Sequence, residues 1–192
     1  TFFDVNLRNI SSFHQANNAD VTLFVHPNDH PYDSDLVELN DDQIITTIHS
    51  YPHDKKWRRN LVNAAIYVIT QSALIGIEFS SKKTDIAKEL FPLMIKKGRK
   101  LYGYISTEYI KDMGTPERLD SVEHDISSGK VTKLKYATMK RALFLDRDGV
   151  VNHEMNHLSS PEQFKLIDGA SKAIRKLNDV GILVVIVTNQ PI

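Results

Sequence analysis

The stretch Ala142-Leu143-Phe144-Leu145-Asp146-Arg147-Asp148-Gly149 decides the fold of the later part of this chain. Its apolar run is typical of a buried strand in a parallel sheet, and ligands of such sheets bind beyond the carboxyl ends of the strands. Because residues i and i+2 of an extended chain face the same side, we expect Asp146 and Asp148 to face one crevice, while Gly149 lets the backbone turn. The pattern predicts phosphoryl transfer, in which one carboxylate attacks phosphorus and the other moves a proton.

A second apolar run, residues 182–187, ends in Thr188 and Asn189. Residues at helical spacing lie between the two runs and predict a helix. They are Asp168 as the cap, Ala170, Ala173, Ile174 and Leu177 as the apolar face, and Gly181 as the end. Crossovers between parallel strands are right-handed, so the β-α-β order predicts that Thr188 and Asn189 emerge at the same sheet edge as Asp146. There a hydroxyl and an amide can hold phosphate oxygens.

These motifs resemble those of the haloacid dehalogenase-like phosphatases, in which one strand ends in Asp-x-Asp-Gly and the next in Thr or Ser. The text of residues 146–152 and 187–190 is similar to the branch that contains heptose-bisphosphate and histidinol-phosphate phosphatases. The resemblance implies that Asp146 is the nucleophile, which forms an aspartyl-phosphate, and that Asp148 is the general acid and base. It also implies that Asp146 and Asp148 hold Mg²⁺ and that Thr188 binds the transferring phosphoryl group.

The alternative for Asp146 and Asp148 is a solvated turn after a strand, because Asp and Gly are common turn residues. The surrounding β-α-β pattern favours the phosphoryl-transfer site. Thr188 and Asn189 taken alone favour a plain strand-end turn, and they become candidates through their partner strand. The phosphatase family also uses a later Lys or Arg and a further acidic loop. We expect these to fall beyond Ile192, so that the chain carries the first part of such a domain and is by itself a poor catalyst.

Composition limits the class of protein. The chain has 192 residues, of which 41% are hydrophobic and 25% are charged, as expected for a soluble globular protein of one or two domains. The 24 Lys and Arg residues balance 24 Asp and Glu residues, so the charge predicts neither nucleic acid nor an anionic membrane as a partner. No apolar segment approaches the roughly 20 residues of a membrane span, and no signal peptide is evident. The absence of cysteine excludes a disulfide framework and agrees with a cytoplasmic location.

The first two-thirds of the chain alternates between helical and strand patterns and predicts a mixed α/β domain. The predicted strands are residues 21–25, 36–39, 44–48, 61–69 and 100–106, and the predicted helices are a segment ending near residue 19, residues 72–77, residues 85–97 and a last helix that begins at Thr115-Pro116. Pro92 should kink or restart its helix. The last helix should bury Leu119, Val122 and Ile126 on one face.

A change of composition marks a boundary between two domains. Residues 127–129 are Ser-Ser-Gly, and the basic stretch 130–135 follows them, which favours an exposed connector. The sequence therefore predicts a first domain at 1–129, a linker at 130–139 and a second domain at 140–192.

Asp112 is the candidate for chemistry in the first domain. It lies in a loop just before a predicted helix, where a carboxylate can bind a divalent cation that bridges nucleotide phosphates. Gly114 would allow close approach of the backbone. The alternative is that Asp112 only favours the positive end of the following helix, and local features leave the two evenly balanced.

Residues 109–118, together with 60–68 and 100–104, resemble the latter part of the sugar-1-phosphate nucleotidyltransferases, and the resemblance covers roughly residues 1–131. It implies a partial Rossmann-like domain in which Asp112 is a Mg²⁺ ligand and Asn63 contacts the sugar. It also implies that the Gly-rich loop for the nucleoside triphosphate precedes this stretch. Family members often have Gly where this chain has Ala65, so the backbone is expected to approach the sugar differently.

The loops at residues 26–35 and 49–59 resemble a branch of heptose-1-phosphate guanylyltransferases that is often joined to a heptose-bisphosphate phosphatase. Arg58 or Arg59 is a candidate for contacting phosphate, although a solvated loop is the default for both. The two resemblances imply a bifunctional enzyme that uses a sugar phosphate and a nucleoside triphosphate, GTP by the resemblance. Two alternatives stay open. The first is a hexose-1-phosphate nucleotidyltransferase joined to a histidinol-phosphate-type phosphatase, and the second is a binding module without catalysis.

Overall fold

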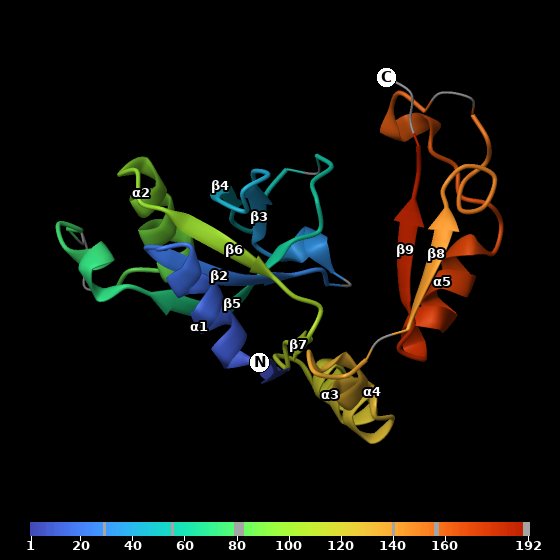
Figure 1. Ribbon diagram of the computed structural model, residues 1–192, viewed down its shortest axis with the longest axis horizontal. Helices are drawn as coiled ribbons and strands as arrows, with labels where there is room; N and C mark the ends of the chain where they lie inside the picture. The colour runs from blue at the N-terminus through green and yellow to red at the C-terminus, as the bar shows by residue number, and fades with distance from the viewer. Residues whose placement is uncertain (29, 55, 79–82, 140, 156–157, 190–192) are drawn as a thin grey trace. The chain divides into compact units, whose positions relative to one another are not determined.

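The computed structural model describes residues 1–28, 30–54, 56–78, 83–139, 141–155 and 158–189 (Figure 1). The chain forms two compact units, Val5–Glu108 and Thr1–Asp4 with Tyr109–Ile192. The first residues group with the later ones because β1, Phe2–Asp4, pairs antiparallel with β7, Tyr109–Lys111. The predicted domain boundaries at 1–129 and 140–192 do not follow this grouping by contacts, and they stay a prediction.

A five-stranded sheet forms the centre of the unit Val5–Glu108, in the order β4-β3-β5-β2-β6. Its strands are β2, Val21–His26; β3, Leu36–Leu39; β4, Ile45–His49; β5, Val62–Ile69; and β6, Leu101–Ile105. β2 and β6 run parallel, and the other neighbours run antiparallel. All five strands predicted from apolar runs are present within one residue of the predicted bounds. The prediction of a mixed α/β fold is confirmed.

Strand β2 is buried on both faces, and this burial places it at the centre of three layers. Its alternate residues Val21, Leu23 and Val25 join a core with Phe91 and Met94 from α2, Phe91–Lys96. The side chains between them face α1, Leu7–Ala16, which contacts β2, β5 and β6 and lies across the strands in Figure 1. The period of two along a strand therefore divides β2 between two helical layers.

The helix predicted at 85–97 restarts at its proline, as expected. Residues Ile86–Leu90 form a π-helical turn, η3, and α2 follows with Pro92 in its first turn. The Leu90 N–H donates to the Asp85 carbonyl oxygen at 3.1 Å. The Asp85 side chain caps the turn by accepting from two backbone N–H groups. Two short 3₁₀ turns, η1 at Pro31–Asp33 and η2 at Gln71–Leu74, complete the unit Val5–Glu108.

Helix α3, Pro116–Ser127, begins where the sequence predicts, but its buried face is narrower than predicted. The Thr115 hydroxyl oxygen caps it by accepting from the Arg118 N–H at 3.3 Å. Val122 is buried, whereas Leu119 and Ile126 are 44% and 49% exposed. The prediction of one apolar face is therefore wrong for these two residues. The helix also buries a carboxylate, Asp125.

The stretch predicted as a linker contains a short helix, α4, Lys130–Leu134. Val131 is buried. Two lysines of the basic stretch form ion pairs within this unit, Lys130 Nζ with Asp125 at 3.2 Å and Lys135 Nζ with Asp4 at 3.1 Å. Composition alone favours a solvated connector, whereas Lys130 and Lys135 each pair with a carboxylate.

The second apolar pattern forms a β-α-β unit, as predicted. Its elements are β8, Ala142–Asp146; the 3₁₀ turn η4, Pro161–Gln163; α5, Ala170–Asp179; and β9, Leu183–Val187. β8 and β9 are parallel and place Asp146 beside Val187. The N-cap of α5 is Gly169, at φ +87°, and not Asp168 as predicted, because the left-handed turn there sets Gly169 at the helix start.

The strands of this unit are not buried, contrary to the prediction. Phe144 is 67% exposed and Ile186 is 47% exposed. One helix covers one face of a two-stranded sheet, and burial of both faces requires a second layer. Within residues 141–155 and 158–189, only Val151 and Asn152 are buried. Across the described ranges, no helix is long and apolar enough to cross a membrane.

Candidate functional site

The end of β8 brings together the residues that the sequence predicts for phosphoryl transfer. Asp146 is the last residue of β8, and its register partner Val187 is the last residue of β9. Thr188 and Asn189 follow Val187 directly, so they leave the sheet at the same edge as Asp146. The placement at one edge agrees with the prediction, and the chemical roles of the side chains stay predictions.

Asp146 is exposed at this edge, and its carboxylate reaches the following loop. The Arg147 backbone N–H donates to Asp146 Oδ1 at 2.7 Å. A carboxylate that accepts a backbone N–H is fixed in direction. Asp146 therefore combines a set orientation with access from solvent, as a nucleophile toward a phosphate ester requires.

Two side chains of the same loop donate hydrogen bonds to Asp148. Arg147 donates from Nε to Oδ1 at 3.1 Å and from Nη2 to Oδ2 at 2.8 Å. Asn152 Nδ2 donates to Oδ1 at 3.1 Å. The hydrogen bond from Arg147, and then that from Asn152, lowers the pKa of Asp148. At neutral pH Asp148 is thus a carboxylate, the form that accepts a proton.

The loop after β8 is closed by backbone hydrogen bonds. The N–H groups of Val151 and Asn152 both donate to the Arg147 carbonyl oxygen, at 2.9 and 3.0 Å. The Gly149 N–H donates to the Asn152 carbonyl oxygen at 2.8 Å, and Gly149 has φ +73°, a left-handed conformation that glycine adopts without strain. The predicted turn at Gly149 is confirmed. The sequence motifs give no role to Arg147 or Asn152, although both lie within residues 146–152.

The donor set at this edge fits Mg²⁺. Carboxylate and carbonyl oxygens are the ligands that this hard cation prefers, and Asp146 and Asp148 supply both kinds. No group of three or more His, Cys, Asp or Glu side chains in the described part of the chain is arranged to hold a metal. Mg²⁺ is held in many enzymes by one or two carboxylates together with substrate phosphate and water, so Asp146 and the backbone carbonyl of Asp148 are the groups here that would hold it.

Asp112 follows β7 and pairs with a basic residue from the first turns of α3. Arg118 Nη1 donates to Asp112 Oδ2 at 2.7 Å, and the Gly114 N–H donates to the same oxygen at 3.3 Å. The hydrogen bond from Arg118 is the main reason that the pKa of Asp112 is lowered. A Cβ on Gly114 would lie 3.0 Å from Asp112 Oδ2, so the small residue allows this loop to close. The cap of α3 is Thr115 and not Asp112.

Asn63 lies on β5 and supports a distortion of that strand. Its Oδ1 accepts from the Ala65 N–H at 3.1 Å, and its Nδ2 donates to the Tyr67 hydroxyl at 3.0 Å. Ala65 has φ +57°, and the pairing of β2 with β5 shifts register opposite this point. This left-handed conformation inside a strand is one that glycine adopts without strain, whereas Ala65 carries a Cβ. Asn63 belongs to the unit Val5–Glu108 and Asp112 to the other unit.

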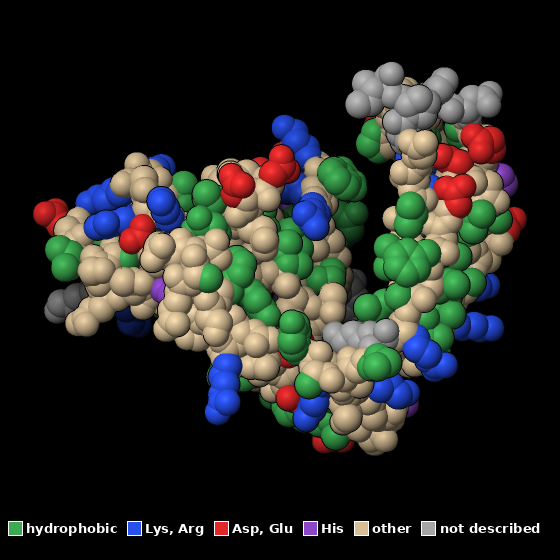
Figure 2. Space-filling view, viewed as in Figure 1, with side chains coloured by type: hydrophobic (Ala, Val, Ile, Leu, Met, Phe, Trp, Pro, Cys, Tyr) green, Lys and Arg blue, Asp and Glu red, His purple; other side chains and the backbone are tan. Residues whose placement is uncertain are grey.

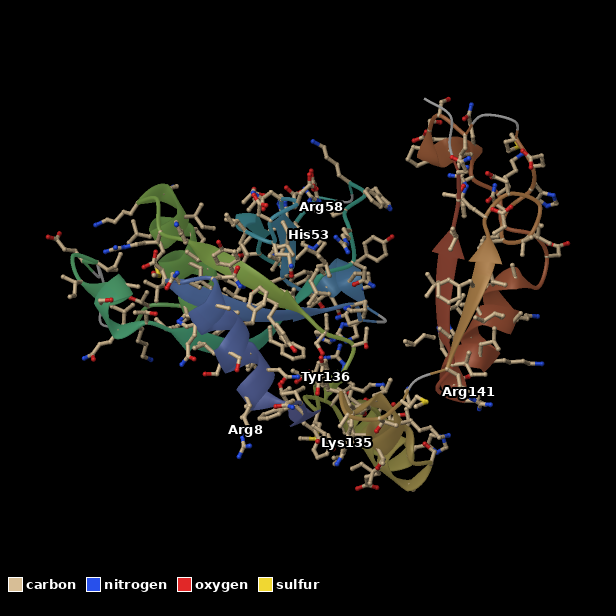
Figure 3. The ribbon with its side chains drawn as sticks, viewed as in Figure 1. Arg8, His53, Arg58, Lys135, Tyr136 and Arg141 are labelled. Carbon is tan, nitrogen blue, oxygen red and sulfur yellow. The ribbon has the colours of Figure 1, made fainter. Side chains whose placement is uncertain are left out.

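The loop between β4 and β5 carries His53 and Arg58, which Figure 3 labels. Arg58 forms ion pairs with Asp54 and Glu38, and its side chain is 11% exposed. His53 Nε2 lies 3.1 Å from the Ser34 carbonyl oxygen. Arg58 therefore stabilises this loop through its ion pairs. This weakens the case for Arg58 as a phosphate contact, which the sequence suggested. Figure 2 shows basic and acidic side chains interspersed on the face in view.

Comparison with known proteins relates the chain to two kinds of enzyme. It is 46% identical over 52 residues to D-glycero-beta-D-manno-heptose-1,7-bisphosphate 7-phosphatase of Pasteurella multocida, which covers 27% of this chain and 28% of that protein. It is 29% identical over 112 residues to mannose-1-phosphate guanylyltransferase of Mycobacterium tuberculosis, which covers 58% of this chain and 30% of that protein. The chain thus spans less than a third of the length of each of these relatives. No protein-family model matches the chain.

Among solved structures, the chain is similar to a Bacillus anthracis protein assigned as a glucose-1-phosphate thymidylyltransferase and determined in complex with sucrose. The TM-score is 0.53 at 15% sequence identity, over 64% of this chain and 50% of that one. At this identity the likeness shows the fold, which is the Rossmann-like α/β fold of nucleotidyltransferases. Over about a quarter of its length the chain is similar in sequence to phosphatases, and over more than half to nucleotidyltransferases.

Proposed function

We propose that the strand-end carboxylates Asp146 and Asp148 belong to a phosphatase that removes the 7-phosphate of D-glycero-D-manno-heptose 1,7-bisphosphate. The observation that carries the proposal is the position of Asp146 at the carboxyl end of β8, level with the end of β9. The 46% identity over 52 residues to a phosphatase of that substrate supports it.

The proposed reaction has two steps. An Asp146 carboxylate oxygen attacks phosphorus, the bond from phosphorus to the sugar oxygen breaks, and the leaving oxygen takes a proton from Asp148. Water then gives a proton to Asp148 and attacks the aspartyl-phosphate, which releases inorganic phosphate and restores Asp146. The hydrogen bond from Arg147 lowers the pKa of Asp148 and favours its ionised form, which is the form that accepts a proton from water in the second step. The first step uses the protonated form of Asp148.

Mg²⁺ bound at this edge would shield the negative charge of the phosphate. Asp146 and the backbone carbonyl of Asp148 are the groups that would hold it. The Thr188 hydroxyl and the Asn189 amide leave the neighbouring strand end, where they would contact the remaining phosphate oxygens.

A second activity is proposed for the longer part of the chain, the transfer of a nucleotidyl group, GMP, from GTP to heptose 1-phosphate. The similarity to a guanylyltransferase and the nucleotidyltransferase fold support it. In this proposal Asp112 holds Mg²⁺ and Asn63 contacts the sugar. In the structure Asp112 pairs with Arg118, and this ion pair is partly exposed.

The two proposed reactions are consecutive. Loss of the 7-phosphate turns a heptose 1,7-bisphosphate into a heptose 1-phosphate, and the transferase would activate that product with release of pyrophosphate. The whole protein would then be a bifunctional enzyme of nucleotide-activated heptose synthesis. A hexose 1-phosphate is the second candidate substrate for the transferase, because the Mycobacterium tuberculosis relative is a mannose-1-phosphate guanylyltransferase.

The experiment that tests both activities uses the natural protein that carries this sequence, with Mg²⁺ present. Purified protein is given heptose 1,7-bisphosphate, and phosphate release and heptose 1-phosphate are measured. GTP is then added, and the sugar nucleotide is identified by mass spectrometry. Parallel reactions contain mannose 1-phosphate or histidinol phosphate. The proposal predicts heptose products from both steps, and failure to release phosphate from the heptose together with release from histidinol phosphate would reject it.

A further inference from the structure

We propose that Asn152 is a positioning residue whose side-chain amide holds the Asp148 carboxylate in the orientation needed for proton transfer. This inference rests on the proposed phosphatase function. Asn152 lies within residues 146–152, the stretch that carries the phosphatase resemblance, and that resemblance gives it no role.

The burial of Asn152 is unusual for its surroundings. Its exposed fraction is 0%, while β8, α5 and β9 contain no buried residue. A polar side chain is removed from water at a cost unless hydrogen bonds replace the lost contacts. Packing in this part of the chain is therefore concentrated beneath the acidic loop and not on the sheet.

The hydrogen bonds of Asn152 set the direction of its amide. Nδ2 donates to Asp148 Oδ1 at 3.1 Å and to the His153 carbonyl oxygen at 2.8 Å. Both partners are acceptors, so a rotated amide would turn its oxygen toward two oxygens. In the described part of the chain, Asn152 Oδ1 has no hydrogen-bond partner. The amide is thus oriented to donate to Asp148, although its own oxygen has no partner among the described residues.

The backbone on both sides of Asn152 is fixed as well. Its N–H and C=O close the loop onto Arg147 and Gly149. The neighbouring residues are bonded to the segment before α5, since the His153 N–H donates to the Lys165 carbonyl oxygen at 2.9 Å and Val151 accepts from the Ile167 N–H at 3.0 Å. The amide of Asn152 therefore reaches Asp148 from a rigid base.

Arg147 and Asn152 differ in what they can do for Asp148. Arg147 is the sequence neighbour of Asp148 and holds it through a long side chain that is 16% exposed. Asn152 has a short, buried side chain and keeps its contact. A general acid and base must stay within hydrogen-bond reach of the oxygen that it serves, and we infer that Asn152 maintains that reach.

The first test measures the hydrogen bond itself in this chain by NMR. Hydrogen exchange of the Asn152 side-chain amide should be about tenfold or more slower than that of Asn178, which is exposed on α5. D148A should speed the exchange and shift the Asn152 signals, whereas the matched variant D146A should leave them in place. Equal exchange at Asn152 and Asn178, or no response to D148A, would overturn the proposal.

The second test measures phosphate release from heptose 1,7-bisphosphate by the natural protein. N152A should lower kcat by about tenfold or more with KM changed by less than about twofold, because orientation and not binding is lost. N152D keeps the side-chain volume but replaces the amide donor with a carboxylate acceptor. It should therefore also lower kcat with little change in KM, and it is the variant to use if N152A fails to fold. N178A is the control. Unchanged kcat in a folded N152 variant rejects the role, and a wild type that releases no phosphate rejects the proposed function, while the exchange result still reports on the bond.

Discussion

Ala65 occupies a backbone conformation that a residue with a Cβ rarely adopts. It occupies a left-handed conformation, at φ +57°, inside β5. That conformation costs a residue with a Cβ about 1–2 kcal/mol, of which glycine would return a part after its greater chain entropy is subtracted. The Asn63 side chain compensates by accepting from the Ala65 N–H.

We therefore expect A65G to raise the free energy of unfolding by about 0.5–1 kcal/mol. Urea unfolding followed by circular dichroism measures the change. A64G is the control, because Ala64 is buried in the same strand without positive φ and its replacement should destabilise the protein. A loss of stability in A65G would contradict the strain at this position.

His14 is a buried histidine that is held neutral. Burial lowers its pKa below 6.5, although nearby Asp20 acts in the opposite direction. The Thr70 hydroxyl donates to the Ala19 carbonyl oxygen, so it accepts from His14 Nε2–H, and His14 Nδ1 accepts from Thr22 at 2.9 Å. Both ring nitrogens are used in the neutral form.

The unfolded chain binds a proton at His14 more readily than the folded chain does. His14 therefore contributes its full stability above pH 6.5 and loses it as the pH falls from 6.5 through the lower folded pKa. The urea concentration at which half of the wild type is unfolded should decrease as the pH falls through that window. H14Q should flatten the fall, and H124Q, at an exposed position, should not. A wild-type midpoint that rises as the pH drops would contradict this assignment.

At the scale of elements, a buried carboxylate joins α3 to β7 and α4. Asp125 Oδ2 accepts from the Tyr109 hydroxyl at 2.9 Å, and Asp125 Oδ1 pairs with Lys130 Nζ at 3.2 Å. The Asp125 side chain is 7% exposed. Its removal would leave partly buried partners without their acceptor.

D125A should lower the free energy of unfolding of this unit by about 2–3 kcal/mol, less than for a fully buried pair because Lys130 is partly exposed. Hydrogen exchange of the α3 amides is the measurement, since it reports on this helix alone. D120A, at an exposed position of the same helix, is the matched control and should change exchange little. Equal effects of the two variants would reject the anchoring role of Asp125.

The elements also show how far the sequence can be read. Apolar runs located β2 to β6, β8 and β9 because backbone hydrogen bonding and alternation are local properties. Burial was less predictable, because it depends on what packs against a face. Leu119 and Phe144 are exposed although their patterns are apolar. For the site too, the sequence predicted the positions that depend on local strand patterns and missed those that depend on packing. Asp146 and Thr188 were placed by strand ends, while Arg147 and Asn152 depend on the path of a loop that no period reveals.

For the whole molecule, the central proposal is that Asp146 is phosphorylated during turnover. D146N would remove the nucleophile, and phosphate release from heptose 1,7-bisphosphate should fall by about a hundredfold or more. D179N, at the exposed end of α5, is the control for a lost carboxylate and should keep the wild-type rate.

The most direct measurement is a rapid acid quench of the natural protein during turnover of heptose 1,7-bisphosphate with Mg²⁺, followed by mass spectrometry of its peptides. We expect one phosphoryl group on the peptide that contains Asp146, present in wild type and D179N and absent in D146N. Phosphate release without any phosphorylated Asp146 peptide, or full activity in D146N, would contradict it.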